Sequence, residues 1–322
     1  MNVAPRSRQT GIAVLTAVLV VAIATVLAVN LLWHASVDLR RTETLLLQDQ
    51  ARQYELGGEE FAKFGLADDA RDDGGESQVD DSGENWAKPL SVEVEGGKLQ
   101  GYVLDQQGRF NLNGLLDKEG KAIPEKAKQF ERLLTFLDLE RPLDPDTARA
   151  LVEATIDWID PDDDPYGLSG AEQDRYTSRQ PPYRPANFWF TSTSELLAVE
   201  GYNREICDAL KDHVSALPPQ SDGTPWKLNV NTATSLVIAS LVDGVDPESL
   251  DTLAGPYESV EKFLDVFPST EQIPAALPLD VRSSWFLLTA TATIGTAQST
   301  MYSLLERNRD VVRVRLRTFD AN

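Results

Sequence analysis

The most prominent feature of the hydropathy pattern lies near the amino terminus, where residues 12–33 form an apolar run without a charged side chain. A helix of that length measures about 33 Å, which is enough to span the hydrocarbon core of a bilayer. Beyond the run, apolar residues recur at helical spacing among Gln, Arg and Glu as far as residue 64. The pattern therefore predicts one long helix over 12–64, of which 12–33 crosses a membrane.

A short basic segment precedes the apolar run. Residues 1–11 carry Arg6 and Arg8 and no acid, so this end is expected to stay in the cytoplasm while the bulk of the chain lies outside. The run is longer than the roughly 7–15 apolar residues of an ordinary secretory signal. A plain single-span anchor with a stalk fits these features. A basic leader that ends in Gly11, followed directly by an apolar helix from Ile12, is also typical of type IV pilin-like precursors.

Strand-like segments occur in two groups, one on each side of the middle of the chain. In the first group, 90–94 and 98–105 flank a Glu-Gly-Gly turn and predict a hairpin. In the second group, strands are expected over 285–295, 299–307 and 311–319, which are rich in β-branched and aromatic residues. Both groups are expected to contribute to one small antiparallel sheet.

The region between the strand groups is helical in its periodicity. Helices are predicted over 123–139, 145–159, 192–201, 203–217, 232–242 and 247–253. The expected fold class is therefore α+β: a pilin-like long N-terminal transmembrane helix packs on a small antiparallel sheet, and a large all-helical domain is inserted between the strands. The expected units are a leader (1–11), the N-terminal helix (12–64), an acidic linker (65–89), strands (90–113), a first, SAM-like helical insert (114–225), a second, helix-hairpin-helix-like insert (226–283) and the C-terminal strands (284–322).

Composition narrows the possible functions. The chain of 322 residues has 51 Asp and Glu against 30 Lys and Arg, a formal charge of −21. Such a chain repels nucleic-acid phosphates. Its single cysteine, Cys207, permits no internal disulfide and excludes a zinc ribbon. The two histidines, His34 and His213, leave little scope for His-based catalysis or His-rich metal sites.

One of two acidic runs lies at 68–84, with eight acids, one base and three glycines. This composition predicts a solvated, flexible connection. A metal-binding loop is the less favoured interpretation, because no spaced apolar residues would hold the geometry of the acids.

The second acidic run lies at 157–174 and is framed by Trp158, Ile159 and Tyr166, which can anchor it to a core. Calcium takes 6–8 oxygen ligands, and the D-x-D-x-D spacing in this run can direct carboxylates to one ion. The EF-hand pattern fails because Pro165 stands where that loop requires Gly. A calcium loop of another type and a solvated turn both remain open. The predicted ligands of one or two Ca²⁺ ions are Asp160, Asp162, Asp164, Glu172 and Asp174.

A family resemblance rests on the order and spacing of several segments. They are TGIAVLTAVLVVA (10–22), YELGGEEFAK (54–63), GRFNLNGL (108–115), DWIDPDDDP (157–165), GAEQDRY (170–176), QPPYRPAN (180–187), SELLAVEGY (194–202) and KLNVNTAT (227–234). In these segments the chain resembles the K family of large minor pseudopilins of the type II secretion system. The resemblance covers nearly the whole length.

The resemblance implies a processing step and a place in an assembly. It implies cleavage between Gly11 and Ile12 by the prepilin peptidase, followed by methylation of Ile12. Thr16 stands where most pilin-like proteins have Glu, a difference that is itself a feature of the K subunits and suits the filament tip. The resemblance further implies calcium in the helical domain and assembly with minor pseudopilins I and J, and with H and the major pseudopilin. It places the chain in the inner membrane with its bulk in the periplasm.

Two other functions agree less well with the sequence. Residues 228–255 resemble a helix-hairpin-helix, which would suggest a nucleic-acid-binding membrane protein, but this stretch contains four acids and no base. A packing role is therefore favoured over nucleic-acid binding. An enzyme is also disfavoured, because Cys207 and His213 are six residues apart on one predicted helix and would point to different faces.

Overall fold

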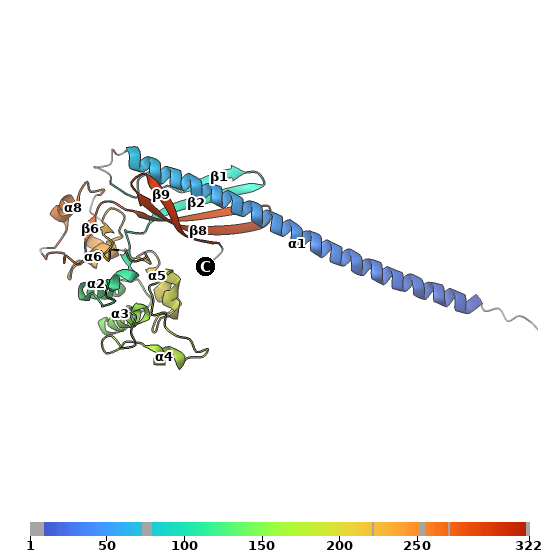
Figure 1. Ribbon diagram of the computed structural model, residues 1–322, viewed down its shortest axis with the longest axis horizontal. Helices are drawn as coiled ribbons and strands as arrows, with labels where there is room; N and C mark the ends of the chain where they lie inside the picture. Colours follow the sequence, from blue (N-terminus) through green and yellow to red (C-terminus); the bar gives the residue numbers. More distant parts are fainter. Residues whose placement is uncertain (1–9, 73–78, 221, 251–254, 270, 320–322) are drawn as a thin grey trace, which may run out of the picture.

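The structure is a computed structural model that describes residues 10–72, 79–220, 222–250, 255–269 and 271–319. Its first element, α1 (Thr10–Asp72), extends away from the rest of the molecule (Figure 1). Its amino-terminal part is long and apolar enough to cross a membrane, with a mean hydropathy of 3.0 over the best window and none of that window buried.

The helix continues eight residues beyond its predicted end, into the start of the predicted linker. Leu66 and Ala67 are buried there against the sheet, and this packing extends the helix to Asp72. The expectation of a linker from residue 65 was therefore wrong for its first eight residues.

Five antiparallel strands form the main sheet in the order β1-β2-β7-β8-β9. They are β1 (Leu90–Val94), β2 (Gly97–Asp105), β7 (Trp285–Ile294), β8 (Ala297–Asn308) and β9 (Val311–Phe319). β2 lies directly beside β7, with Gly97 opposite Ile294 and Asp105 opposite Phe286. The chain between these neighbours is thus a single insertion, which confirms the predicted architecture.

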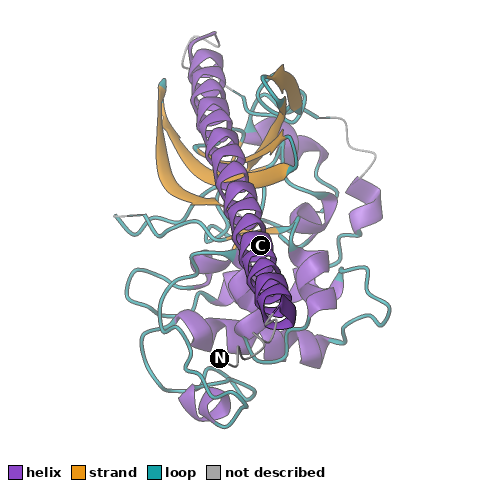
Figure 2. Ribbon diagram, turned by 90° about the vertical axis from the view of Figure 1, so that its right-hand side faces the viewer, coloured by secondary structure: helices purple, strands orange, loops and turns teal. Residues whose placement is uncertain are grey.

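One face of this sheet is covered by α1 (Figure 2). Leu66 of α1 packs in one cluster with Phe286, Leu288 and Met301 of the sheet. Gly58 allows close contact, because a Cβ there would lie 3.2 Å from Leu99. The packing on the sheet starts at Leu47 and Ala51, so the part of α1 before these residues projects as a stalk.

The insertion consists of short helices and, among the described residues, four short strands around its own core, so the expectation of an all-helical inserted domain was wrong in this respect. In chain order these are β3 (Phe110–Asn111), η1 (Leu112–Leu115), α2 (Pro124–Thr135), α3 (Pro145–Ile159), α4 (Gln173–Thr177), η2 (Thr193–Ala198), α5 (Arg204–Leu210), β4 (Val214–Ser215), β5 (Leu228–Asn229), α6 (Ser235–Ala239), α7 (Pro247–Leu250), α8 (Val260–Val266) and β6 (Leu279–Asp280). One hydrophobic cluster extends from Phe110 to Val281. The boundary predicted at residue 226 therefore does not separate two cores.

Several predicted helices are shorter than expected. The helix predicted over 203–217 ends at Leu210, because the chain then forms β4, which pairs in parallel with β3. Residues 192–201 contain a 3-10 helix, η2, whose capping box is formed by Ser192 and Glu195 as expected. The two helices predicted in the hairpin are shorter, as α6 and α7, and residues 251–253 of the second prediction lie outside the described residues.

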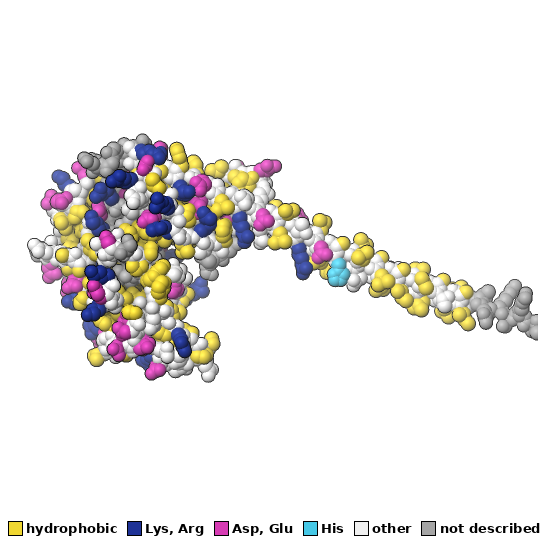
Figure 3. Space-filling view, in the orientation of Figure 1, with side chains coloured by type: hydrophobic (Ala, Val, Ile, Leu, Met, Phe, Trp, Pro, Cys, Tyr) yellow, Lys and Arg dark blue, Asp and Glu magenta, His cyan; other side chains and the backbone are white. Residues whose placement is uncertain are grey.

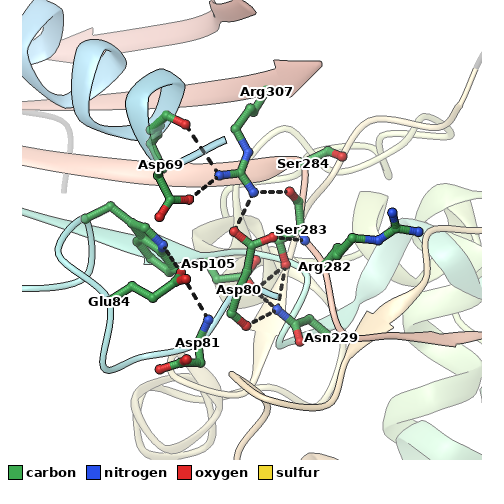
Figure 4. Close-up of polar contacts among 12 residues, drawn as sticks. Asp69, Asp80, Asp81, Glu84, Asp105, Asn229, Arg282, Ser283, Ser284 and Arg307 are labelled. Carbon is green, nitrogen blue, oxygen red and sulfur yellow. Dashed lines mark hydrogen bonds and ion pairs between the residues drawn. The ribbon is translucent and has the colours of Figure 1, made fainter. Parts of the chain in front are cut away.

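A buried polar junction joins α1, the acidic linker, the sheet and the insertion (Figure 4). Arg307 of β8 is 3% exposed and forms ion pairs with Asp69 and Asp80. Asp80 also accepts a hydrogen bond from the main chain of Ser283 at 2.7 Å. The solvated linker predicted over 68–84 is therefore wrong at these positions, because a buried arginine from a distant strand pairs with the acids.

Candidate metal centre

The second half of α3 presents acidic side chains to the interior of the insertion. Glu153 and Asp157 are four residues apart, so they lie on the same face of the helix. Asp160 occupies the C-cap of α3 and Glu172 the N-cap of α4. The loop between these caps returns over the acids, so residues separated by twelve positions meet again.

Three carboxylates converge at this loop. Oxygen atoms of Asp157, Asp160 and Glu172 all lie within 4.8 Å of one another, and the side chains are 0%, 6% and 8% exposed. Asp157 Oδ2, Asp160 Oδ1 and both carboxylate oxygens of Glu172 are buried without a hydrogen-bond partner among the described residues. Unpaired buried acceptors are costly, so this arrangement requires a cation or protons.

The electrostatics of the cluster agree with that requirement. Burial, together with the neighbouring acids, raises the pKa of Asp157 to about 6 and those of Asp160 and Glu172 to about 7. The hydrogen bond that Asp157 Oδ1 accepts from the main chain of Tyr166, at 2.8 Å, only partly counteracts this. A divalent cation would remove the repulsion between the three carboxylates.

Two glycines let the loop lie directly against the acids. A Cβ at Gly170 would lie 2.3 Å from Asp157 Oδ2, and one at Gly167 would lie 2.2 Å from Glu153 Oε1. Gly167 also has φ +72°, which favours glycine. Glu153 in turn accepts hydrogen bonds from the main-chain N–H groups of Leu168 and Ser169. The loop is therefore held by main-chain donors on carboxylates of α3.

The five residues predicted as ligands occupy different positions. Asp160 and Glu172 belong to the buried cluster. Asp162 is exposed, and its carboxylate accepts the main-chain N–H of Asp164 at 2.9 Å. Asp164 and Asp174 are exposed as well and lie outside the group of converging oxygens.

Asp157 was part of the acidic run but was not among the predicted ligands. The D-x-D-x-D spacing predicts ligands in the loop after α3, whereas the carboxylate of Asp157 comes from the helix itself. Helical periodicity could have indicated it, because Glu153 and Asp157 fall on the same face as the apolar residues that α3 buries.

The residues present fit a calcium ion. All donors in the cluster are carboxylate oxygens, the ligand type that calcium takes at 2.3–2.6 Å, and oxygens within 4.8 Å of one another can share one ion of that size. Beside this loop, the amide nitrogen of Asn187 donates to the carbonyl of Asp162 at 3.2 Å, and its side-chain oxygen is buried without a partner among the described residues.

The polar junction contains a second acidic cluster of Asp69, Asp80 and Glu84. Burial raises the pKa of Asp80 to about 6 and that of Glu84 to about 7. Here Arg307 lies between the acids and supplies the positive charge (Figure 4). The guanidinium of Arg307 therefore supplies a cation to this cluster. Among the described residues, no side chain supplies one to the cluster around Asp157.

Comparisons with known proteins agree over nearly the full length. A sequence profile described as "Type II secretion system (T2SS), protein K" matches residues 108–219. The chain is 32% identical to type II secretion system protein K of Pseudomonas aeruginosa, over 95% of this chain and 91% of that protein. It is also 32% identical to the protein of the same name from Aeromonas hydrophila, over 96% of both chains.

The fold agrees with a solved relative. A chain in the crystal structure of the GspK-GspI-GspJ complex from enterotoxigenic Escherichia coli superposes with a TM-score of 0.74 at 23% identity, covering 88% of this chain and 100% of that one. Together with the identities above, the chain belongs to the type II secretion system protein K family.

Proposed function

We propose that this chain is a non-catalytic minor pseudopilin that caps the tip of the periplasmic pseudopilus and supports export of folded proteins across the outer membrane. The observation that carries the proposal is the shape of the subunit. A membrane-length apolar helix continues as a stalk, and the large insertion lies at its distal end (Figure 1). A bulky distal end is suited to the last subunit of a filament, which needs no neighbour above it.

The side chain at the fifth mature position supports a terminal place. The Thr16 hydroxyl donates to the carbonyl of Ala13 at 3.0 Å, so it is satisfied inside its own helix. A carboxylate at this depth would need a partner from a neighbouring subunit. A subunit with Thr16 can therefore insert without that pairing.

Assembly is proposed along the stalk of α1. Outside the membrane-length segment, this helix carries large apolar side chains that are 60–70% exposed: Leu39, Leu45, Leu46, Phe61 and Phe64. Helices of minor pseudopilins I and J are the proposed partners of this apolar surface, with H and the major pseudopilin further along the filament. The solved relative was crystallised as a GspK-GspI-GspJ complex.

The loop around Asp157 is proposed to hold calcium. Asp157, Asp160 and Glu172 would supply the central ligands, with Asn187 and the exposed Asp162, Asp164 and Asp174 as candidates for completing the shell. The ion would supply a positive charge that fixes the loop between α3 and α4. We assign it a structural role at the distal end of the subunit.

The proposed place in the inner membrane and the proposed processing are tested together. Mass spectrometry of the protein from a cell with an active prepilin peptidase should show a mature chain that starts at N-methylated Ile12. The periplasmic part should then be retained by immobilised I and J partners. Loss of that retention in a Leu45→Glu/Leu46→Glu variant, but not in a control Arg204→Glu variant on the insertion, would locate the contact on α1. A chain that keeps residues 1–11 and ignores both partners would refute the proposal.

A further inference from the structure

A large cleft lies at the end of the molecule farthest from the start of α1. It has a volume of about 1050 Å³ and lies between the last turn of α1, the turn from β8 to β9 and the segments that surround β5 and β6. Arg71, in the last turn of α1, is one of its lining residues. From residue 33 to Arg71 the helix rises about 57 Å. We call this feature the distal cleft.

The charge of the distal cleft is opposite to that of the protein. The whole chain has a formal charge of −21. The exposed or half-exposed cations of the cleft are Arg71, Lys227, Arg282 and Arg309, and its acids are Asp280 and Asp310. Arg307 also lines it, but its guanidinium is held by the buried acids of the polar junction. Figure 3 shows Lys and Arg side chains gathered over the region where α1 ends and β8 meets β9.

The internal ion pairs leave part of this positive charge available. The carboxylate of Asp280 is shared by Lys227 at 2.9 Å and Arg282 at 3.4 Å. Burial alone would raise the pKa of Asp280, yet the two cations hold it below its ordinary value. One carboxylate thus faces two cations, and a second carboxylate from outside can join them.

The remaining cations are also open to an external anion. Arg71 and Asp310 form a pair at 3.4 Å with both side chains about half exposed, and exposed pairs of this kind exchange partners easily. Among the residues that the structure describes, no carboxylate lies within ion-pair distance of Arg309. The side chain of Arg282 points away from the buried junction (Figure 4).

The cleft also offers groups that suit a polypeptide. The amide side chain of Gln220 and the indole of Trp226 line it between the cations. The Trp226 Nε1 donates to the carbonyl of Pro218 at 2.8 Å, which orients the ring. Amides pair with peptide groups, and a fixed aromatic ring packs against extended chain. A concave site of this kind encloses a ligand, whereas a flat bilayer surface could not enter it.

We propose that the distal cleft binds an extended acidic polypeptide segment of a partner protein. Carboxylates of the segment contact Arg282, Arg309 and Arg71, and its main chain lies along Gln220 and Trp226. The site is separate from the candidate metal centre and from the apolar surface of α1, and the proposal does not require that the chain cap a filament. Because the attraction is largely electrostatic, the contact forms quickly and weakens with salt.

The test uses the full chain in detergent micelles and fluorescein-labelled hexaglutamate as the probe, read by fluorescence anisotropy. Binding is expected, with affinity falling at least about tenfold between low salt and about 300 mM salt. An Arg282→Gln/Arg309→Asn double variant should lose at least about tenfold in affinity. Asn is chosen because Arg309 has φ +54°, which Asn tolerates. An unchanged thermal midpoint shows that the variant is folded.

A matched control separates a specific site from general charge effects. The double variant Arg184→Gln/Arg204→Gln removes the same charge from exposed positions of the insertion and should bind as the parent does. Equal losses in both double variants would overturn the proposal. Binding to phosphatidylglycerol vesicles without binding to hexaglutamate would also overturn it, since this would indicate a lipid site. Displacement of the probe by inorganic phosphate at a concentration equal to that of the probe's carboxylates would indicate a small-anion site and would overturn it too.

Discussion

Asp157 shows how a single residue can determine a site that the local motif does not reveal. Its Oδ1 atom accepts the main-chain N–H of Tyr166, while Oδ2 is buried without a hydrogen-bond partner among the described residues. One of its oxygens lies within 4.8 Å of carboxylate oxygens of Asp160 and Glu172. The repeated aspartates of the following loop are exposed, so water can take their place in the coordination shell of an ion. Burial therefore distinguishes the central carboxylates from the peripheral ones.

At the residue scale, we predict different effects for two acid-to-amide substitutions. Asp157→Asn should abolish the rise in thermal midpoint that calcium causes, because it removes a central buried ligand. Asp174→Asn should retain most of that rise, because its carboxylate is exposed. At a calcium concentration about 100 times Kd the parent should gain about 2.7 kcal/mol. Differential scanning fluorimetry in calcium and in EGTA measures both variants.

Two results of this measurement would contradict the assignment of the central ligands. A parent whose midpoint is the same in calcium and in EGTA would refute the metal centre. Loss of the calcium effect in Asp174→Asn but not in Asp157→Asn would move the site to the exposed face of the loop.

The polar junction shows how elements distant in sequence are tied together. Arg307 on β8 reaches Asp69 on α1 and Asp80 in the linker, and its guanidinium lies 4.8 Å from the ring centroid of Phe286. Asn229 at the start of the hairpin segment donates to Asp105 at the end of β2. These contacts hold the end of α1, the sheet and the insertion in one arrangement.

At the element scale, Arg307→Met should be strongly destabilising. Removing the cation leaves the carboxylates of Asp69 and Asp80 without their counter-ion in a buried site, at a cost of about 3–5 kcal/mol. Arg315→Met is the matched control, because Arg315 pairs with Glu306 while about half exposed and should cost only about 0–1 kcal/mol. Urea unfolding followed by tryptophan fluorescence compares the two. Equal midpoints for both variants would show that the junction does not hold these elements together.

The whole molecule combines a projecting apolar helix with an acidic distal body. The 51 acids are not equivalent: Asp69 and Asp80 pair with Arg307 in the junction, Asp280 and Asp310 line the distal cleft, and three acids meet in the candidate metal centre. The pKa values of Asp80 and Glu84 in the junction, and of Asp157, Asp160 and Glu172 in the metal centre, are raised. These groups therefore have a common effect on the stability of the chain as pH changes.

At the scale of the whole molecule, the benefit of calcium should grow with pH. An acid whose pKa is raised on folding keeps its proton longer in the native state, so it destabilises the native state as pH rises from about 4 to about 7. In EGTA the thermal midpoint should therefore fall across this window. Calcium replaces the lost protons at Asp157, Asp160 and Glu172, so the difference between the two midpoints should widen. A difference that is constant from pH 4.5 to 7.5 would contradict this prediction.

Much of the architecture was predictable because it depends on periodicity. The apolar run, the helix over 145–159 and the strands from Trp285 onward appear in the structure within a few residues of their predicted bounds. Predictions failed where contacts from distant segments replaced local ones. α5 ends at Leu210 because β4 pairs with β3, and α1 extends to Asp72 because Leu66 packs on the sheet.

The candidate metal centre likewise has one feature that follows from the sequence and one that depends on the fold. The sequence by itself determined that acids cluster after α3 beside apolar anchors, since that depends only on their order in the chain. The tertiary structure decided which acids converge, because the fold of the loop over α3 buries Asp157, Asp160 and Glu172 and leaves Asp164 and Asp174 in solvent. It likewise decided that Asp80 is paired with Arg307, 227 residues away, because hydrogen bonds to the main chain of Val281 and Ser283 hold Asp80 beside β8.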